Sequence, residues 1–127
     1  MAESFGVKMG VEGEKEFKNA LKEINSAFKV LGSEMNLVTS QFDKNDKSIQ
    51  SLSARNGVLT KEIEAQKNKV QTLQAALENA SSSFGEADSR TRSWQIQLNN
   101  AQADLNKMES ELKANEDAIC LLYTSPS

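Results

Sequence analysis

The stretch LTKEIEAQKNKVQTLQAAL, residues 59–77, decides the fold of this chain. Alternating steps of four and three residues from Leu59 to Leu77 meet an apolar side chain everywhere except at Gln66. In an α-helix this spacing gathers the apolar side chains into one narrow stripe, which is the pattern of a coiled coil. The stretch therefore predicts a helix that packs lengthwise against another helix.

The same register extends in both directions over most of the chain. With position a at every residue number divisible by seven and d four residues before it, 25 of the 30 positions from Phe17 to Ile119 are apolar, although the chain as a whole is only 38% hydrophobic. This repeat is far longer than the three or four heptads that identify a coiled coil. The seam is predicted to consist of Phe17, Leu21, Ile24, Phe28, Leu31, Met35, Val38, Phe42, Ile49, Leu52, Asn56, Leu59, Ile63, Gln66, Val70, Leu73, Leu77, Trp94, Leu98, Leu105, Met108 and Leu112.

The polar residues on the seam have two interpretations. A buried Asn at an a position costs stability but fixes the register and the oligomeric state, and Asn56 is the best candidate for that role. Gln66 and Asn45 are weaker candidates. The alternative is that all three only loosen the packing.

The charges beside the seam argue against one arrangement. In a parallel dimer of identical chains, Asp104 would face Glu109 and Glu111 would face Glu116 across the interface. Both pairs are repulsive, although each such pair changes stability by only a few tenths of a kcal/mol. The C-terminal part therefore does not favour a parallel homodimer.

Two short segments interrupt the helical pattern. Residues 43–46, DKND, are polar and turn-like, and residues 81–88 contain Ser82–Gly85 followed by Asp88, which suits a helix N-cap. The heptad phase is nevertheless unchanged across both segments, and an arbitrary loop keeps it only about one time in seven. We therefore predict an all-α chain whose residues 14–119 form a nearly continuous rod, about 160 Å long at 1.5 Å per residue. The alternative is a helical hairpin that folds back at Ser82–Gly85.

The N-terminal residues 1–13 have a different period. Apolar residues alternate with glycine or charged residues from Phe5 to Val11, which predicts a short β-strand ahead of the helices. One strand alone leaves its backbone groups unpaired, so it would need a partner strand from elsewhere. The alternative is a disordered arm.

The C-terminal octapeptide CLLYTSPS, residues 120–127, follows the charged helical pattern abruptly. It resembles the translated end of a transposase adapter used in sequencing libraries. We interpret it as an artefact and expect the natural gene to continue past Ile119. The alternative is a genuine short C-terminal tail.

Composition excludes most catalytic chemistry. The chain has no His and one Cys, so Ser–His and Cys–His catalysis and His-based metal sites are excluded. The net charge of −3 is spread along the chain without a basic block, and no apolar run is long enough to cross a bilayer. We therefore expect no enzymatic activity, no cofactor or metal, no small-molecule substrate, no sequence-specific nucleic acid and no membrane segment in these residues. The seam aromatic Trp94 is expected in the core.

The opening FGVKMGVEGEKEFKNAL, residues 5–21, combines a predicted strand with a Gly-Glu-Lys-Glu-Phe helix start. Together with VTSQFD at residues 38–43 and WQIQLNNA at residues 94–101, it resembles the N-terminal region of bacteriophage tail tape-measure proteins. The resemblance covers about residues 4–119.

This resemblance implies a structural role. Tape-measure proteins form a long helical scaffold along which the tail tube polymerises, so that protein length sets tail length. The resemblance implies self-association through helices, contact with tail-tube and tail-assembly proteins, and a location in the host cytoplasm during assembly and then in the lumen of the virion tail. The alternative function is a small helical-hairpin protein-interaction module, either an adaptor or a secreted protein.

Overall fold

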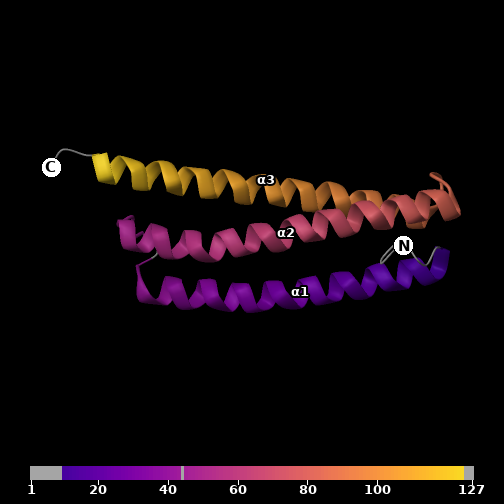
Figure 1. Ribbon diagram of the computed structural model, residues 1–127, viewed down its shortest axis with the longest axis horizontal. Coiled ribbons are helices and arrows are strands. Elements are labelled where there is room, and N and C mark those ends of the chain that lie inside the picture. The colour runs from indigo at the N-terminus through magenta and orange to yellow at the C-terminus, as the bar shows by residue number, and fades with distance from the viewer. Residues whose placement is uncertain (1–9, 44, 125–127) are drawn as a thin grey trace.

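The computed structural model describes residues 10–43 and 45–124, which fold into three α-helices (Figure 1). They are α1 (Gly10–Gln41), α2 (Ile49–Phe84) and α3 (Ser89–Thr124). Each helix runs antiparallel to the one before it, and α2 lies between α1 and α3. The backbones of α1 and α3 do not approach each other within this described part of the chain. The predicted all-α class is confirmed.

The predicted continuous rod is wrong, because the chain reverses direction at both interruptions. In the first turn, the carboxylate of Asp43 accepts a hydrogen bond from the backbone of Asn45 at 3.0 Å, and that of Asp46 accepts one from Ser48 at 2.8 Å. The Ser48 hydroxyl in turn accepts from the backbone N–H of Ser51 and caps α2. Short polar side chains that bond to nearby backbone in this way stabilise a turn against a continuing helix.

The second turn depends on a glycine. Gly85 has φ +92°, a conformation that favours glycine over residues with a Cβ, and its N–H still donates to the Ser81 carbonyl at 3.1 Å. Asp88 then accepts a hydrogen bond from the Arg90 N–H at 2.8 Å and caps the start of α3. The chain therefore folds back over residues 85–88.

The heptad phase did not distinguish a rod from this fold because the apolar stripe finds its partner within the same chain. Asn115 Nδ2 donates to Asn56 Oδ1 at 2.9 Å, which places a d residue of α3 level with an a residue of α2. In an antiparallel pair of heptad helices, seven-residue steps in opposite directions repeat this arrangement, so Ile63 lies level with Met108. Closing a turn of a few residues costs less entropy than bringing separate molecules together.

Both ends of the helical region differ from the prediction. The helix begins at Gly10, so residues 10–13 belong to α1 and not to a strand or arm. The rest of the predicted strand, Phe5 to Met9, lies outside the described residues. At the other end α3 continues through Thr124 and includes the first five residues of the octapeptide at 120–127. In the described part of the chain, no helix combines the length and the apolar character that crossing a bilayer requires.

Truncating the centre of α2 should destabilise the fold. Leu73 is fully buried between the helices, so Leu73→Ala should lower the free energy of unfolding by about 2–5 kcal/mol through lost burial and a residual cavity. Leu37→Ala makes the same change in α1 at a side chain that is 61% exposed, and its effect should stay within about 0.5 kcal/mol. Urea unfolding followed by circular dichroism measures both. Equal losses would contradict the assignment of Leu73 to the core.

Candidate functional site

The predicted seam residues lie at the helix interfaces, and none of them is exposed. Phe42 is the only one that falls outside a helix, directly after α1. The buried members are Phe17, Leu21, Leu31, Leu52, Leu59, Ile63, Gln66, Val70, Leu73, Trp94 and Leu105. The half-buried members are Ile24, Phe28, Met35, Val38, Phe42, Ile49, Asn56, Leu77, Leu98, Met108 and Leu112. Two other positions of the same register, Asn45 and Ala87, lie in the two turns and are exposed.

The polar seam residues of α2 are paired across the interface with α3. Gln66 is 2% exposed and donates from Nε2 to the backbone carbonyl of Ala101 at 2.8 Å. Asn56 accepts from Asn115 as described above. The acceptor for Gln66 is a backbone carbonyl, which every residue of α3 possesses, whereas the Asn56–Asn115 bond needs one particular side chain on each helix. A polar group that loses its partner in an interface costs about 1–3 kcal/mol, so the Asn56–Asn115 bond favours this register of α2 and α3. The third polar seam residue, Asn45, is exposed in the first turn.

Sequence reasoning missed a second contact stripe on α2. Ser51, Val58, Thr72 and Asn79 are buried although they lie outside the seam, and α2 faces α1 as well as α3. These residues recur at seven-residue intervals, with Ala65 at the remaining interval, and none of the five is charged. That uncharged column was a usable signal that α2 contacts two neighbours.

Ion pairs and ring contacts border the α1–α2 interface. Lys61 Nζ lies 3.3 Å from the Glu34 carboxylate, and Lys69 Nζ lies 3.5 Å from Asn25 Oδ1 and 5.9 Å from the centre of the Phe28 ring. The Lys61–Glu34 pair is largely exposed, so it contributes only about 0–1 kcal/mol. The burial of apolar side chains therefore holds α1 on α2, and these contacts orient it.

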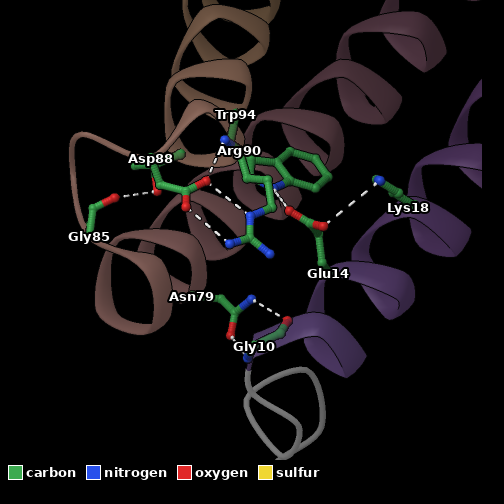
Figure 2. Close-up of polar contacts among 9 residues, drawn as sticks. Gly10, Glu14, Lys18, Asn79, Gly85, Asp88, Arg90 and Trp94 are labelled. Carbon is green, nitrogen blue, oxygen red and sulfur yellow. Dashed lines mark hydrogen bonds and ion pairs between the residues drawn. The ribbon is translucent and has the colours of Figure 1, made fainter.

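A cluster of polar side chains joins all three helices where α1 begins, beside the turn between α2 and α3 (Figure 2). We call this cluster the polar junction. It contains Gly10, Glu14, Asn79, Asp88, Arg90 and Trp94. Its residues come from α1, α2, α3 and the second turn.

The buried carboxylate of Glu14 is the centre of the polar junction. Glu14 is only 9% exposed, and its Oε2 accepts a hydrogen bond from the indole Nε1 of Trp94 at 3.1 Å. Lys18, one turn further along α1, lies 3.9 Å from the other carboxylate oxygen. A carboxylate is buried at reasonable cost only when it is hydrogen-bonded or paired. The Glu14–Trp94 bond therefore ties the start of α1 to α3 although their backbones are apart.

The first residue of α1 is held by α2. The N–H of Gly10 donates to Asn79 Oδ1 at 2.9 Å and lies 3.1 Å from the Ser83 hydroxyl, and the Gly10 carbonyl accepts from Asn79 Nδ2 at 3.2 Å. The side-chain amide of Asn79 thus supplies one hydrogen-bond acceptor and one donor to the backbone of Gly10. This contact fixes the level at which α1 starts along α2.

The second turn carries the strongest charge pair of the polar junction. The Arg90 guanidinium makes two hydrogen bonds to the Asp88 carboxylate, at 2.9 and 3.0 Å, and lies 3.5 Å from the centre of the Phe84 ring. Hydrogen bonds from the side chain and the backbone of Arg90 lower the pKa of Asp88 to about 2. The turn is therefore stabilised by an ionised Asp88 at neutral pH.

The antiparallel packing of α2 and α3 brings two acidic side chains, Glu62 and Glu111, to the same groove. A groove of about 380 Å³ is lined by residues of all three helices, among them Met35, Leu59, Glu62 and Glu111. Burial, and then the negative charge of Glu111, raise the pKa of Glu62.

Within the described residues, no three acidic or thiol side chains are grouped so that they could hold a metal ion.

Comparison of the chain with models of known protein families, with curated proteins and with solved structures gives no match.

A double-mutant cycle should detect the bond between Glu14 and Trp94. Trp94→Phe removes the indole N–H that donates to Glu14. Its cost in free energy of unfolding should be about 1–3 kcal/mol larger in the wild type than in the Glu14→Met background, where no buried carboxylate needs a donor. Lys18→Met in place of Glu14→Met is the control, and its coupling to Trp94 should be below about 0.5 kcal/mol because Lys18 is exposed. Additive losses for Glu14 and Trp94 would show that the bond contributes nothing.

Acid should remove the contribution of Asp88. The pKa of Asp88 is lower in the folded chain than its ordinary value of 3.8, so its stabilising effect is present above pH 3.8 and is lost as the pH falls through about 2. Asp88→Asn imitates the protonated form. Wild type should therefore be more stable than Asp88→Asn at pH 6, and the difference should disappear near pH 2, as measured by urea unfolding at each pH. A difference that does not depend on pH would contradict the role of the carboxylate charge.

Proposed function

We propose that this chain is a scaffold segment of a phage tail tape-measure protein, in which heptad helices template the length and assembly of the tail tube. One observation carries the proposal. A single a/d register serves all three helices, and every seam position inside them is buried or half-buried. Helices that share one register are interchangeable partners, so the same stripe can pair within a segment or along a longer assembly.

The physical basis of the proposal is that a helix converts residue number linearly into distance. The longest helices here have 36 residues and measure about 54 Å at 1.5 Å per residue. The three helices joined end to end would reach about three times as far. In this proposal the antiparallel form belongs to the segment alone, and the extended form belongs to the assembled tail. The resemblance of residues 5–21 to the start of tape-measure proteins supports the same role.

The partners in this proposal follow from the surface of the helices outside the seam. The surface outside the seam carries mixed charges. Apart from the consecutive residues Leu121, Leu122 and Tyr123 near the end of α3, the large exposed apolar residues Val11, Val30, Leu37 and Ile96 are well separated in sequence. Such a surface favours contact through many weak polar sites along a tube wall over one tight binding pocket. We propose that tail-tube and tail-assembly proteins contact this surface, with no catalytic step, in the host cytoplasm and later in the tail lumen.

The second candidate is a helical-hairpin interaction module, as an adaptor or a secreted protein. It is favoured by the turns, because both carry side-chain hydrogen bonds that hold the chain folded back. A module of this kind would act in its antiparallel form. Its function would not depend on how many heptads it contains.

In-frame changes of length separate the two candidates. Removing five heptads of α2, about 35 residues, from the full gene should shorten phage tails by about 50 Å, and duplicating the same residues should lengthen them equally. Tail lengths are measured by electron microscopy of negatively stained particles. Tails of unchanged length from both variants would overturn the scaffold proposal and leave the interaction module.

A further inference from the structure

The turn between α2 and α3 contains one seam position, Ala87, that the hairpin leaves uncovered, whereas Phe84 just before the turn packs against the core. Phe84 occupies an a position at the end of α2 and is half-buried, whereas Ala87 occupies the next d position and is exposed. Residues 85–88 therefore connect the two helices without any shift in the heptad phase. A turn that only reverses the chain has no need for residues in register.

The register between α2 and α3 is symmetric about this turn. Asn56 lies level with Asn115, and seven-residue steps from that pair bring Leu77 level with Trp94. One further step brings Phe84 level with Ala87, so the centre of the register falls between Gly85 and Glu86. A single long helix over residues 49–124 would therefore match an antiparallel copy of itself in the register that the hairpin already has.

We propose that a second copy of this chain is a binding partner, and that the two copies exchange α3 by opening the turn at residues 85–88 into helix. In this swapped dimer every level of the α2–α3 seam forms between copies, and it forms twice. The Asn56–Asn115 and Gln66–Ala101 hydrogen bonds are kept. One new level is added at the centre, where Phe84 of each copy packs on Ala87 of the other.

The remaining helix permits the exchange. The uncharged column of α2 that runs from Ser51 to Asn79 packs toward α1 and lies outside the seam, so α1 stays on its own α2. The hydrogen bond from Trp94 to Glu14 then forms between copies with unchanged geometry. The exchange leaves the first turn unchanged, because α1 keeps its place on its own α2, where Phe17 and Leu21 belong to the same hydrophobic cluster as Leu59 and Leu73.

Three features of the turn hold the monomer closed. They are the positive φ of Gly85, the Asp88 side chain that caps α3, and the hydrogen bond at 2.7 Å from the Thr91 hydroxyl to the Gly85 carbonyl. All three are lost in a continuous helix, whereas the seam contacts of the hairpin are kept in both forms and the dimer adds only the central level. The turn therefore sets the balance between monomer and dimer, and higher protein concentration favours the dimer.

The first test changes the turn alone. Gly85→Ala with Asp88→Ala removes the left-handed residue and the cap, and both alanines favour helix. Sedimentation equilibrium should give a dimer Kd at least tenfold lower than that of the wild type, and small-angle scattering should show a maximum dimension of about 115 Å for a helix of residues 49–124. Gly57→Ala is the matched control, since Gly57 lies within α2 with open space around its Cα, and its Kd should be unchanged.

A second variant acts in the opposite direction. Four glycines inserted after Gly85 lengthen the turn and oppose a continuous helix, so this chain should stay monomeric at concentrations where the wild type dimerises. Circular dichroism checks that all variants keep their helix content. A Gly85→Ala/Asp88→Ala chain that is helical and monomeric at millimolar concentration would overturn the proposal.

A cross-link identifies which copy each helix pairs with. Asn56→Cys with Asn115→Cys is made in a Cys120→Ser background, so that the engineered thiols are the only ones. Oxidation of the dimer fraction should link two chains, whereas oxidation of the monomer should link one chain to itself. Dimers that contain only intrachain links would overturn the exchange of α3. The outcome does not depend on the scaffold role, because tail length is not part of this measurement.

Discussion

A single apolar stripe that must be covered along its whole length is the constraint on which this fold depends. No helix here has a buried interior of its own, so each is stable only while another helix lies against it. The hydrophobic cluster around Leu73 and Trp94 spans all three helices. The helices lie side by side because lengthwise antiparallel contact covers the most stripe for the shortest connections.

Apolar contact alone leaves the axial position of one helix along the next loosely defined, because each layer of a heptad interface resembles the following one. Polar groups remove this freedom at chosen levels. Asn56 meets Asn115, Gln66 meets the Ala101 carbonyl, and Glu14 meets the Trp94 indole. A shift by one heptad would separate Asn56 from Asn115 or the buried Glu14 carboxylate from the Trp94 indole. The stripe therefore supplies most of the stability, and these few polar pairs make the arrangement unique.

Much of this fold was predictable, and the limits have physical causes. Period-seven patterning predicted the helices, and the polar residues at 43–46 and near Gly85 marked both interruptions, although a reversal was considered only at Ser82–Gly85. The patterning did not reveal that the partners lie within the chain, because a heptad stripe is the same whichever helix covers it. The polar junction was also missed. Glu14 was assigned to a helix start, but its bond to Trp94 joins residues 80 apart in sequence, and only the antiparallel arrangement brings them together.

The same stripe is compatible with a hairpin, a swapped dimer and an extended assembly, since each form covers it with an equivalent partner. The choice among them is therefore made outside the stripe, by the few residues that bend the chain. At the second turn these are a glycine in a left-handed conformation, an ionised carboxylate and one hydroxyl. Their contributions are small beside that of the core but comparable to the difference between two forms that share it. In the proposed exchange of α3, the balance between monomer and dimer is therefore set by the turn and not by the core.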